Sequence, residues 1–134
     1  MGYSVNVTGE IDITPPIPWG QIKDSPFRPE EARKAQKDVK FRIESSERET
    51  DEGTLTVRSA TALMPTWVED ARARHLVEHV QAVIDTHPGH EFTGRLYCAG
   101  ERPGDLWRVE VHDRRAVRLD ARIVWPDGSE GFDQ

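Results

Sequence analysis

A short run of residues in the middle of the chain has the composition and spacing of a zinc hydrolase motif. His75, Glu78 and His79 match the H-x-x-E-H pattern, in which two histidines four residues apart on a helix share a metal and the glutamate acts as a base. Because no third ligand stands at a recognisable spacing, we interpret His75 and His79 as flanks of an amphipathic helix and expect no metal and no other cofactor. A small metal-dependent hydrolase remains one alternative function.

The polar residues in the last third of the chain suggest a binding surface. Segments 91–99, 105–112 and 116–125 alternate between apolar and polar residues, as the strands of an antiparallel meander do. The alternation directs the apolar set, which includes Trp107 and Leu119, towards the core. It predicts that a second set shares the outward face of the meander: Arg95, Tyr97, Arg108, His112, Arg118 and Arg122.

Arginines beside an aromatic ring can bind a phosphate, a carboxylate or an acidic protein. Glu110 and Asp120 fall among these arginines and neutralise part of their charge. The pattern therefore favours a protein partner with an acidic surface over a generic polyanion. A small-ligand or nucleic-acid binder that uses the same arginine face is a second alternative. A solvated sheet face with interleaved charges would show a similar pattern.

Trp19 is a further candidate contact residue. It follows the proline-rich run 15–18, which should end the preceding strand because proline cannot donate to a ladder. A tryptophan in such a connector either packs over the core as a lid or anchors a partner, and the sequence leaves both interpretations open.

The N-terminal half predicts a strand, two short helical turns and a hairpin. Residues 3–13 alternate as a half-buried strand, with Gly9 at a position that calls for a bulge or close packing. Short helices are expected over 19–23 and 28–35. Residues 39–63 read as a hairpin whose polar connection runs from Ser45 to Glu52, with Gly53 closing it.

The segment 67–87 gives the clearest helical pattern. Its apolar residues recur at helical spacing, Thr66 and Glu69 match a capping box, and Pro88-Gly89 would end the helix. We therefore predict an α+β fold, in which one long amphipathic helix packs on one face of an antiparallel sheet of about six strands. The strands are the N-terminal strand, the hairpin and the three-stranded C-terminal meander.

Length and composition indicate one domain. With 134 residues, the chain is near the usual size of a domain, and we expect the domain to span 1–128 and a mobile tail to span 129–134. A net charge of −6 makes nucleic acid an unlikely partner and disfavours an anionic membrane. The single cysteine, Cys98, permits no disulfide within the chain, and no signal peptide or membrane span is apparent. These features predict a cytoplasmic protein.

Several short stretches resemble a known family. They are GY at 2–3, VTGEI at 7–11, PPIPW at 15–19, HEFTGRL at 90–96 and IVWPDG at 123–128. Together they are similar to a family of small uncharacterised proteins of actinobacteria and their phages. The resemblance implies a bacterial setting with a link to mobile elements. It implies no activity and assigns no role to any residue.

These observations favour a binding protein over an enzyme. We expect a non-enzymatic accessory protein of a bacterium or its phage that acts through a protein partner. The arginine face of the meander and Trp19 are the predicted contact residues. Neither the partner's identity nor the oligomeric state follows from the sequence.

Overall fold

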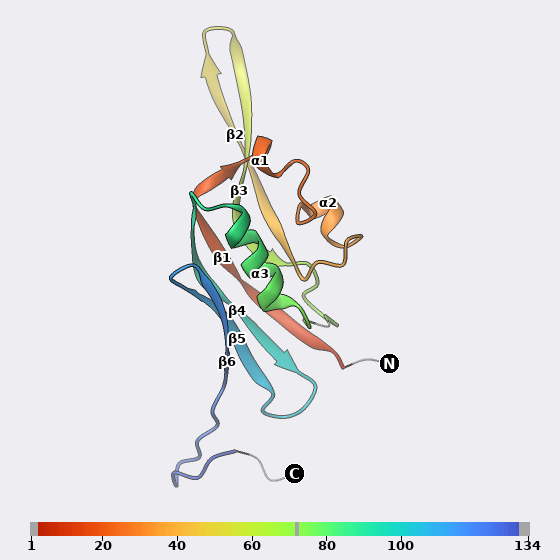
Figure 1. The fold of residues 1–134 in the computed structure, drawn as a ribbon, viewed down its shortest axis with the longest axis vertical. Helices are drawn as coiled ribbons and strands as arrows, with labels where there is room; N and C mark the ends of the chain where they lie inside the picture. Colours follow the sequence, from red (N-terminus) through yellow and green to blue (C-terminus); the bar gives the residue numbers. More distant parts are fainter. Residues whose placement is uncertain (1–2, 72, 132–134) are drawn as a thin grey trace.

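The computed structural model describes residues 3–71 and 73–131 (Figure 1). One antiparallel sheet has the strand order β2-β3-β1-β4-β5-β6. The strands are β1 (Val5–Pro18), β2 (Val39–Thr50), β3 (Gly53–Pro65), β4 (Glu91–Gly100), β5 (Leu106–His112) and β6 (Arg115–Asp120). The helices are α1 (Trp19–Ile22), α2 (Pro29–Ala32) and α3 (Leu76–Thr86). The predicted six-stranded antiparallel sheet is confirmed.

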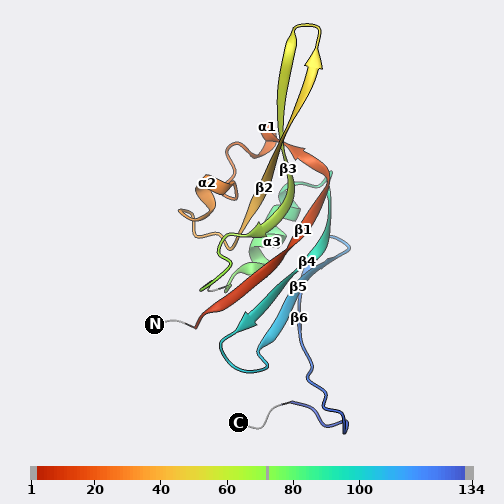
Figure 2. The same ribbon diagram turned by 180° about the vertical axis from the view of Figure 1, so that it is seen from behind.

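All three helices lie on one face of the sheet. In Figure 1, α3 stands in front of the strands and α2 lies beside β2, and the view from behind in Figure 2 shows the strands in front of α3. The core fills the space between α3 and this face, because apolar side chains of both elements point into it. Its fully buried members include Val80 and Ile84 of α3, Ile11 of β1, Leu96 of β4 and Val109 of β5.

The predicted long helix over 67–87 is wrong. Among the described residues, α3 is the only helix longer than a single turn, and its 11 residues begin at Leu76. The preceding residues pair instead with the free edge of β1, where the amides of Val5 and Val7 donate to the carbonyls of Ala71 and Val68 at 2.8 Å. Unpaired backbone amides at a strand edge beside the core cost free energy. These residues therefore supply hydrogen-bond partners to β1 rather than extend the helix. Thr66 is buried and caps no helix.

Asp38 closes the start of α3 in place of the predicted capping box. Its carboxylate accepts the amide of His75 at 2.8 Å, and its own amide donates to Nδ1 of His79 at 2.9 Å. A carboxylate at a helix N-terminus is favoured by both the free amides and the helix dipole. The residue before β2 therefore fixes the helix on the sheet.

Two glycines allow β1 and β4 to approach closely. Gly9 lies opposite Leu96 and Gly94 lies opposite Ile11, and both glycines have positive φ, at 98° and 126°. A Cβ on Gly9 would lie 2.5 Å from the carbonyl oxygen of Arg95. The close packing expected at Gly9 is confirmed.

The proline run does not end β1. The ladder with β3 is irregular between Asp12 and Ile17 and resumes with Ile17 opposite Ala60. Pro15 and Pro16 fall inside the irregularity, where the ladder needs no amide from them. The side chain of Ile17 is fully buried, and this holds the end of β1 against the sheet.

The predicted short helices at 19–23 and 28–35 appear as α1 and α2, each four residues long.

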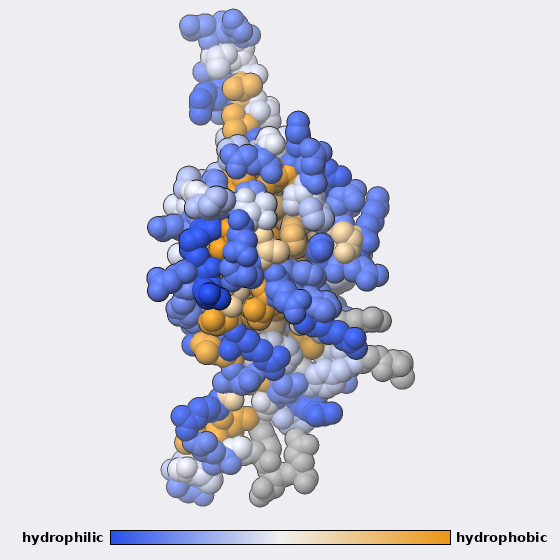
Figure 3. All heavy atoms as spheres, viewed as in Figure 1, coloured by the Kyte–Doolittle hydropathy of each residue, from blue (hydrophilic) through white to orange (hydrophobic). Residues whose placement is uncertain are grey.

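The distal parts of β2 and β3 form a two-stranded arm that projects from the sheet (Figure 1). The ladder between them continues to Thr50 opposite Gly53, so most of the predicted connection 45–52 is strand. Side chains along the arm are mainly exposed, including Leu55. Figure 3 shows apolar atoms among the charged ones there.

The end of the chain also departs from expectation. The strand predicted over 116–125 ends at Asp120, and Val124 then bridges back to Glu130. The amide of Gly131 donates to the carbonyl of Ile123 at 2.9 Å. Residues 129–131 of the predicted mobile tail thus pair back with 123–125 across a turn at 126–127, and 132–134 lie outside the described residues. No described helix is long and apolar enough to cross a membrane.

Candidate functional site

The uncovered sheet face holds a carboxylate surrounded by cations. Glu110 of β5 has a side chain only 6% exposed, although no helix covers it, because the side chains of Arg95, Arg108 and His112 surround it. Nε2 of His112 lies 2.7 Å from the carboxylate, Nε of Arg95 lies 3.7 Å away, and Nε of Arg108 is in direct contact. The hydrogen bond from His112 and then the two guanidinium charges hold the pKa of Glu110 below its ordinary value of 4.5, against the effect of burial.

The ion pairing extends across the sheet towards β2. Glu10 of β1 lies opposite Arg95 of β4, and Arg42 of β2 binds Glu10 with one nitrogen at 2.8 and 2.9 Å. Charges of opposite sign thus alternate along Arg42, Glu10, Arg95 and Glu110. Glu110 neutralises part of this face, as predicted, but Asp120 does not, because it lies opposite Trp107 on the face that the helices cover. Glu10 takes that role instead, and the balanced charges disfavour a generic polyanion.

Arg118 does not share this face, and the predicted arginine array is wrong in that respect. In the ladder of β5 and β6, Val109 lies opposite Arg118 and Arg108 lies opposite Leu119. The side chain of Arg118 is therefore on the face that the helices cover. There its guanidinium lies 4.4 Å from the centre of the Trp107 ring and pairs with Asp120 at 2.9 Å.

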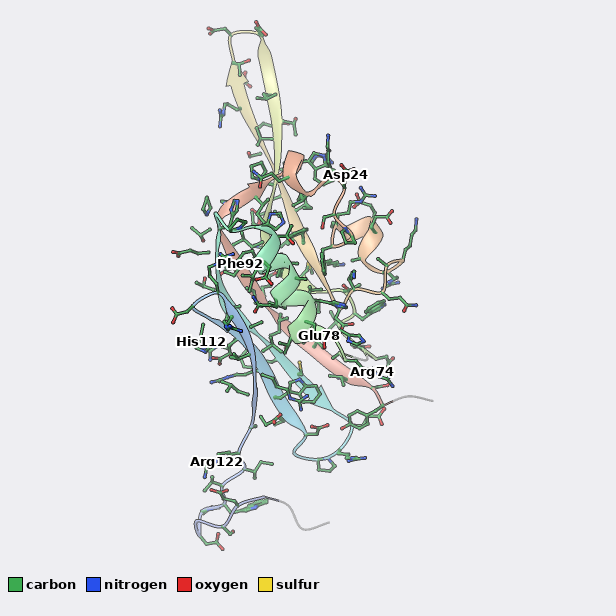
Figure 4. The ribbon with its side chains drawn as sticks, viewed as in Figure 1. Asp24, Arg74, Glu78, Phe92, His112 and Arg122 are labelled. Carbon is green, nitrogen blue, oxygen red and sulfur yellow. The ribbon has the colours of Figure 1, made fainter. Side chains whose placement is uncertain are left out.

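His112 and Arg122 are also not brought together. His112 ends β5 beside the turn to β6, whereas Arg122 lies beyond the end of β6 and pairs with Glu130 (Figure 4). The six predicted residues therefore do not form one compact donor array. Arg95, Tyr97, Arg108 and His112 share the uncovered face, and Arg122 lies at its lower end.

The sheet geometry produces an apolar hollow that the sequence did not reveal. A hollow of about 660 Å³ lies over the ends of β1, β4, β5 and β6. Its apolar lining includes Tyr97, Leu106 and Leu119, which are 49%, 48% and 42% exposed, respectively. Arg108 and Arg122 also line it. Leu119 was missed because its apolar character suggested the core. Leu106 was assigned to neither face, although the alternation places it on the same side as Arg108.

Trp19 lies on the other face of the sheet. It begins α1, is partly buried and packs against the core, with the guanidinium of Arg58 at 4.1 Å from its ring centre. This position matches the lid interpretation of Trp19. The structure does not bring Trp19 near the apolar hollow.

The histidines of the hydrolase-like motif have other partners. Nδ1 of His75 lies 3.2 Å from the carboxylate of Glu78, and Nδ1 of His79 accepts the amide of Asp38. Burial is the main cause that lowers the pKa of His79 below 6.5. Within 3–71 and 73–131, no group of three or more histidine, cysteine, aspartate or glutamate residues could hold a metal.

Burial raises the pKa of the Cys98 thiol to about 11, which leaves a poor nucleophile at neutral pH.

Comparison with known proteins places the chain in a family. Residues 1–133 match the family of unknown function DUF6205, so the chain belongs to this family. Neither the curated proteins nor the solved structures gave a match.

Proposed function

We propose that the protein is a non-enzymatic binding protein that captures a protein partner on the uncovered face of its sheet. The observation that supports this most strongly is the apolar hollow formed by Tyr97, Leu106 and Leu119. Half-exposed apolar side chains that cluster around a concavity are typical of interaction sites, because removing apolar surface from water lowers the free energy. We further propose that the protein comes from an actinobacterium or from one of its phages, and that it acts in the bacterial cytoplasm.

The lining of the hollow suggests the chemistry of the partner. Tyr97 offers a flat ring of the kind that dominates binding energies at interfaces. Arg108 and Arg122 stand at the same hollow and can turn to an incoming carboxylate, although each already has an acidic neighbour. A partner segment that inserts an apolar side chain and presents an acidic residue beside it fits this arrangement.

A selection from a random peptide library tests the proposal. The wild-type protein should enrich peptides that pair an apolar residue with an acidic one. These peptides should bind the double variant Tyr97→Ser, Leu119→Ser at least about tenfold more weakly, because both changes remove apolar contact area. Leu55→Ser on the arm is the matched control and should retain affinity, since Leu55 is 49% exposed and far from the hollow. Equal binding by the double variant would refute the proposal.

A further inference from the structure

A second hollow lies on the helix side of the molecule, and it differs in character from the apolar one. It has a volume of about 520 Å³, within the range of small-molecule sites. The segment after α2 and the segment that leads into α3 form its walls. The lining residues that bear on its chemistry are Arg33, Asp38, Trp67, Asp70, Arg74 and His75.

Two arginines at this hollow have no counter-ion among the described residues. Neither Arg33 nor Arg74 makes a side-chain ion pair or hydrogen bond in the described part of the chain, and both side chains are exposed. By contrast, Arg42, Arg108 and Arg122 all bind carboxylates. These two guanidinium groups are free to bind an anion at one concavity, where Asp38 and Asp70 also stand and balance their formal charge.

The acidic residues at the hollow have different roles. Asp38 is committed to the amide of His75 at the start of α3 and is largely buried. Asp70 is exposed and has no side-chain partner among the described residues, so its carboxylate is available to accept hydrogen bonds. The hollow thus combines a cationic pair, a separate acceptor and the indole of Trp67.

The backbone around the hollow is unusual. Five described residues other than glycine have positive φ, and Gln36, Asp70 and Ala73 are three of them, with φ of 55°, 57° and 51°. All three lie in the two wall segments, and Gln36 and Asp70 line the hollow. The positive φ of Gln36 belongs to the end of α2, where the amide of Lys37 donates to the carbonyl of Ala32 at 2.8 Å. The conformations of Asp70 and Ala73 cost free energy of the kind that is often found at functional sites.

We propose that this hollow binds a nucleoside monophosphate. Arg33 and Arg74 would bind the phosphate, because guanidinium groups match its geometry with paired donors. The indole of Trp67 would contact the base, since every base has a flat face that packs on an aromatic ring. Asp70 would accept a ribose hydroxyl. This site is separate from the uncovered sheet face, so it does not depend on the function proposed above.

Calorimetric titration at low ionic strength tests the assignment with AMP, GMP, CMP and UMP, and with inorganic phosphate and adenosine as part-ligands. At least one nucleotide should bind more tightly than both phosphate and adenosine. Arg33→Gln and Arg74→Gln should each weaken that binding by about tenfold or more, as expected when a charged hydrogen-bonding group is lost. Arg48→Gln removes the same charge from the exposed arm and should leave the affinity unchanged.

The variants should fold, because both arginines are exposed, and an unchanged melting temperature verifies this. Trp67→Leu should weaken nucleotide binding while sparing any binding of inorganic phosphate. Three results would overturn the proposal: no binding of any nucleotide, an affinity unaffected by Arg33→Gln and Arg74→Gln, or phosphate binding as tight as nucleotide binding. The last result would indicate an anion site without recognition of the nucleoside.

Discussion

Arg108 and Leu119 lie directly opposite each other on β5 and β6, so their side chains share the uncovered face of the sheet. Arg108 contacts the buried carboxylate of Glu110 on one side and borders the apolar hollow on the other. Leu119 is 42% exposed beside it. This pairing joins a neutralised ion-pair network to an apolar concavity, a combination that suits selective binding of a protein segment.

The turn between β5 and β6 should control the stability of α3. Arg114 in that turn donates to the carbonyls of Ile84, His87 and His90 at the end of the helix. Arg114→Ala would leave these carbonyls without their charged donor and should lower the free energy of unfolding by about 2 kcal/mol. Urea denaturation measures the difference. The exposed neighbour Arg115 is the control, and a loss in Arg115→Ala equal to that in Arg114→Ala would contradict this role.

The close approach of β1 and β4 should make Gly9 intolerant of any side chain. Gly9→Ala combines a positive φ with a Cβ placed 2.5 Å from the Arg95 carbonyl oxygen, so we expect a loss of about 3 kcal/mol or more. Gly20→Ala in α1 meets no atom within 4 Å and should be neutral or slightly stabilising. Thermal or urea unfolding of the two variants compares them directly, and similar losses at both positions would argue against the strand packing described.

Stability should fall as the pH drops below 6.5. Burial is the main cause that lowers the pKa of His87, with the nearby charge of His90 acting in the same direction, and burial also lowers that of His79. In this range the unfolded chain binds more protons than the folded one, so the free energy of unfolding rises with pH and is lost on acidification. The contribution of both histidines to the free energy of unfolding is complete above about pH 6.5, which is the ordinary pKa of histidine.

Replacing His87 isolates its share of this acid sensitivity. His87→Phe should reduce the difference in unfolding free energy between pH 7.5 and pH 5.5, because the buried ring of this variant takes up no proton. His75→Gln changes a histidine whose side chain is 57% exposed and serves as the control. An undiminished pH effect in His87→Phe would show that His87 does not contribute.

The register of β6 explains why sequence alone placed Arg118 on the wrong face. The apolar residues Val117 and Leu119 suggested that they face the core. The tight turn at Asp113 and Arg114, both with positive φ, instead pairs His112 with Arg115 and so fixes every later pair. Turn geometry outweighed the apolar pattern because β6 is short and ends beyond α3, where Arg118 can lie over Trp107.

Other parts of the fold were predictable because their patterns were local. The alternation in β1, β4 and β5 and the helical spacing of Val80 and Ile84 identified their elements correctly. The start of α3 was not predictable, because the residues before it pair with β1, which is distant in sequence. Tyr97 and Arg108 were correctly placed on the outward face, whereas the concavity beside them depends on the register and twist of four strands.

Mapping of amide chemical shifts tests most directly whether the uncovered face of the sheet is the binding surface. Titration of the ¹⁵N-labelled protein with a peptide selected for binding should shift the amides of Tyr97, Leu106, Arg108 and Leu119. The amides of α1 and α2 should stay in place, because they lie on the opposite face. Shifts concentrated on the helix side, with those four amides unmoved, would contradict the account.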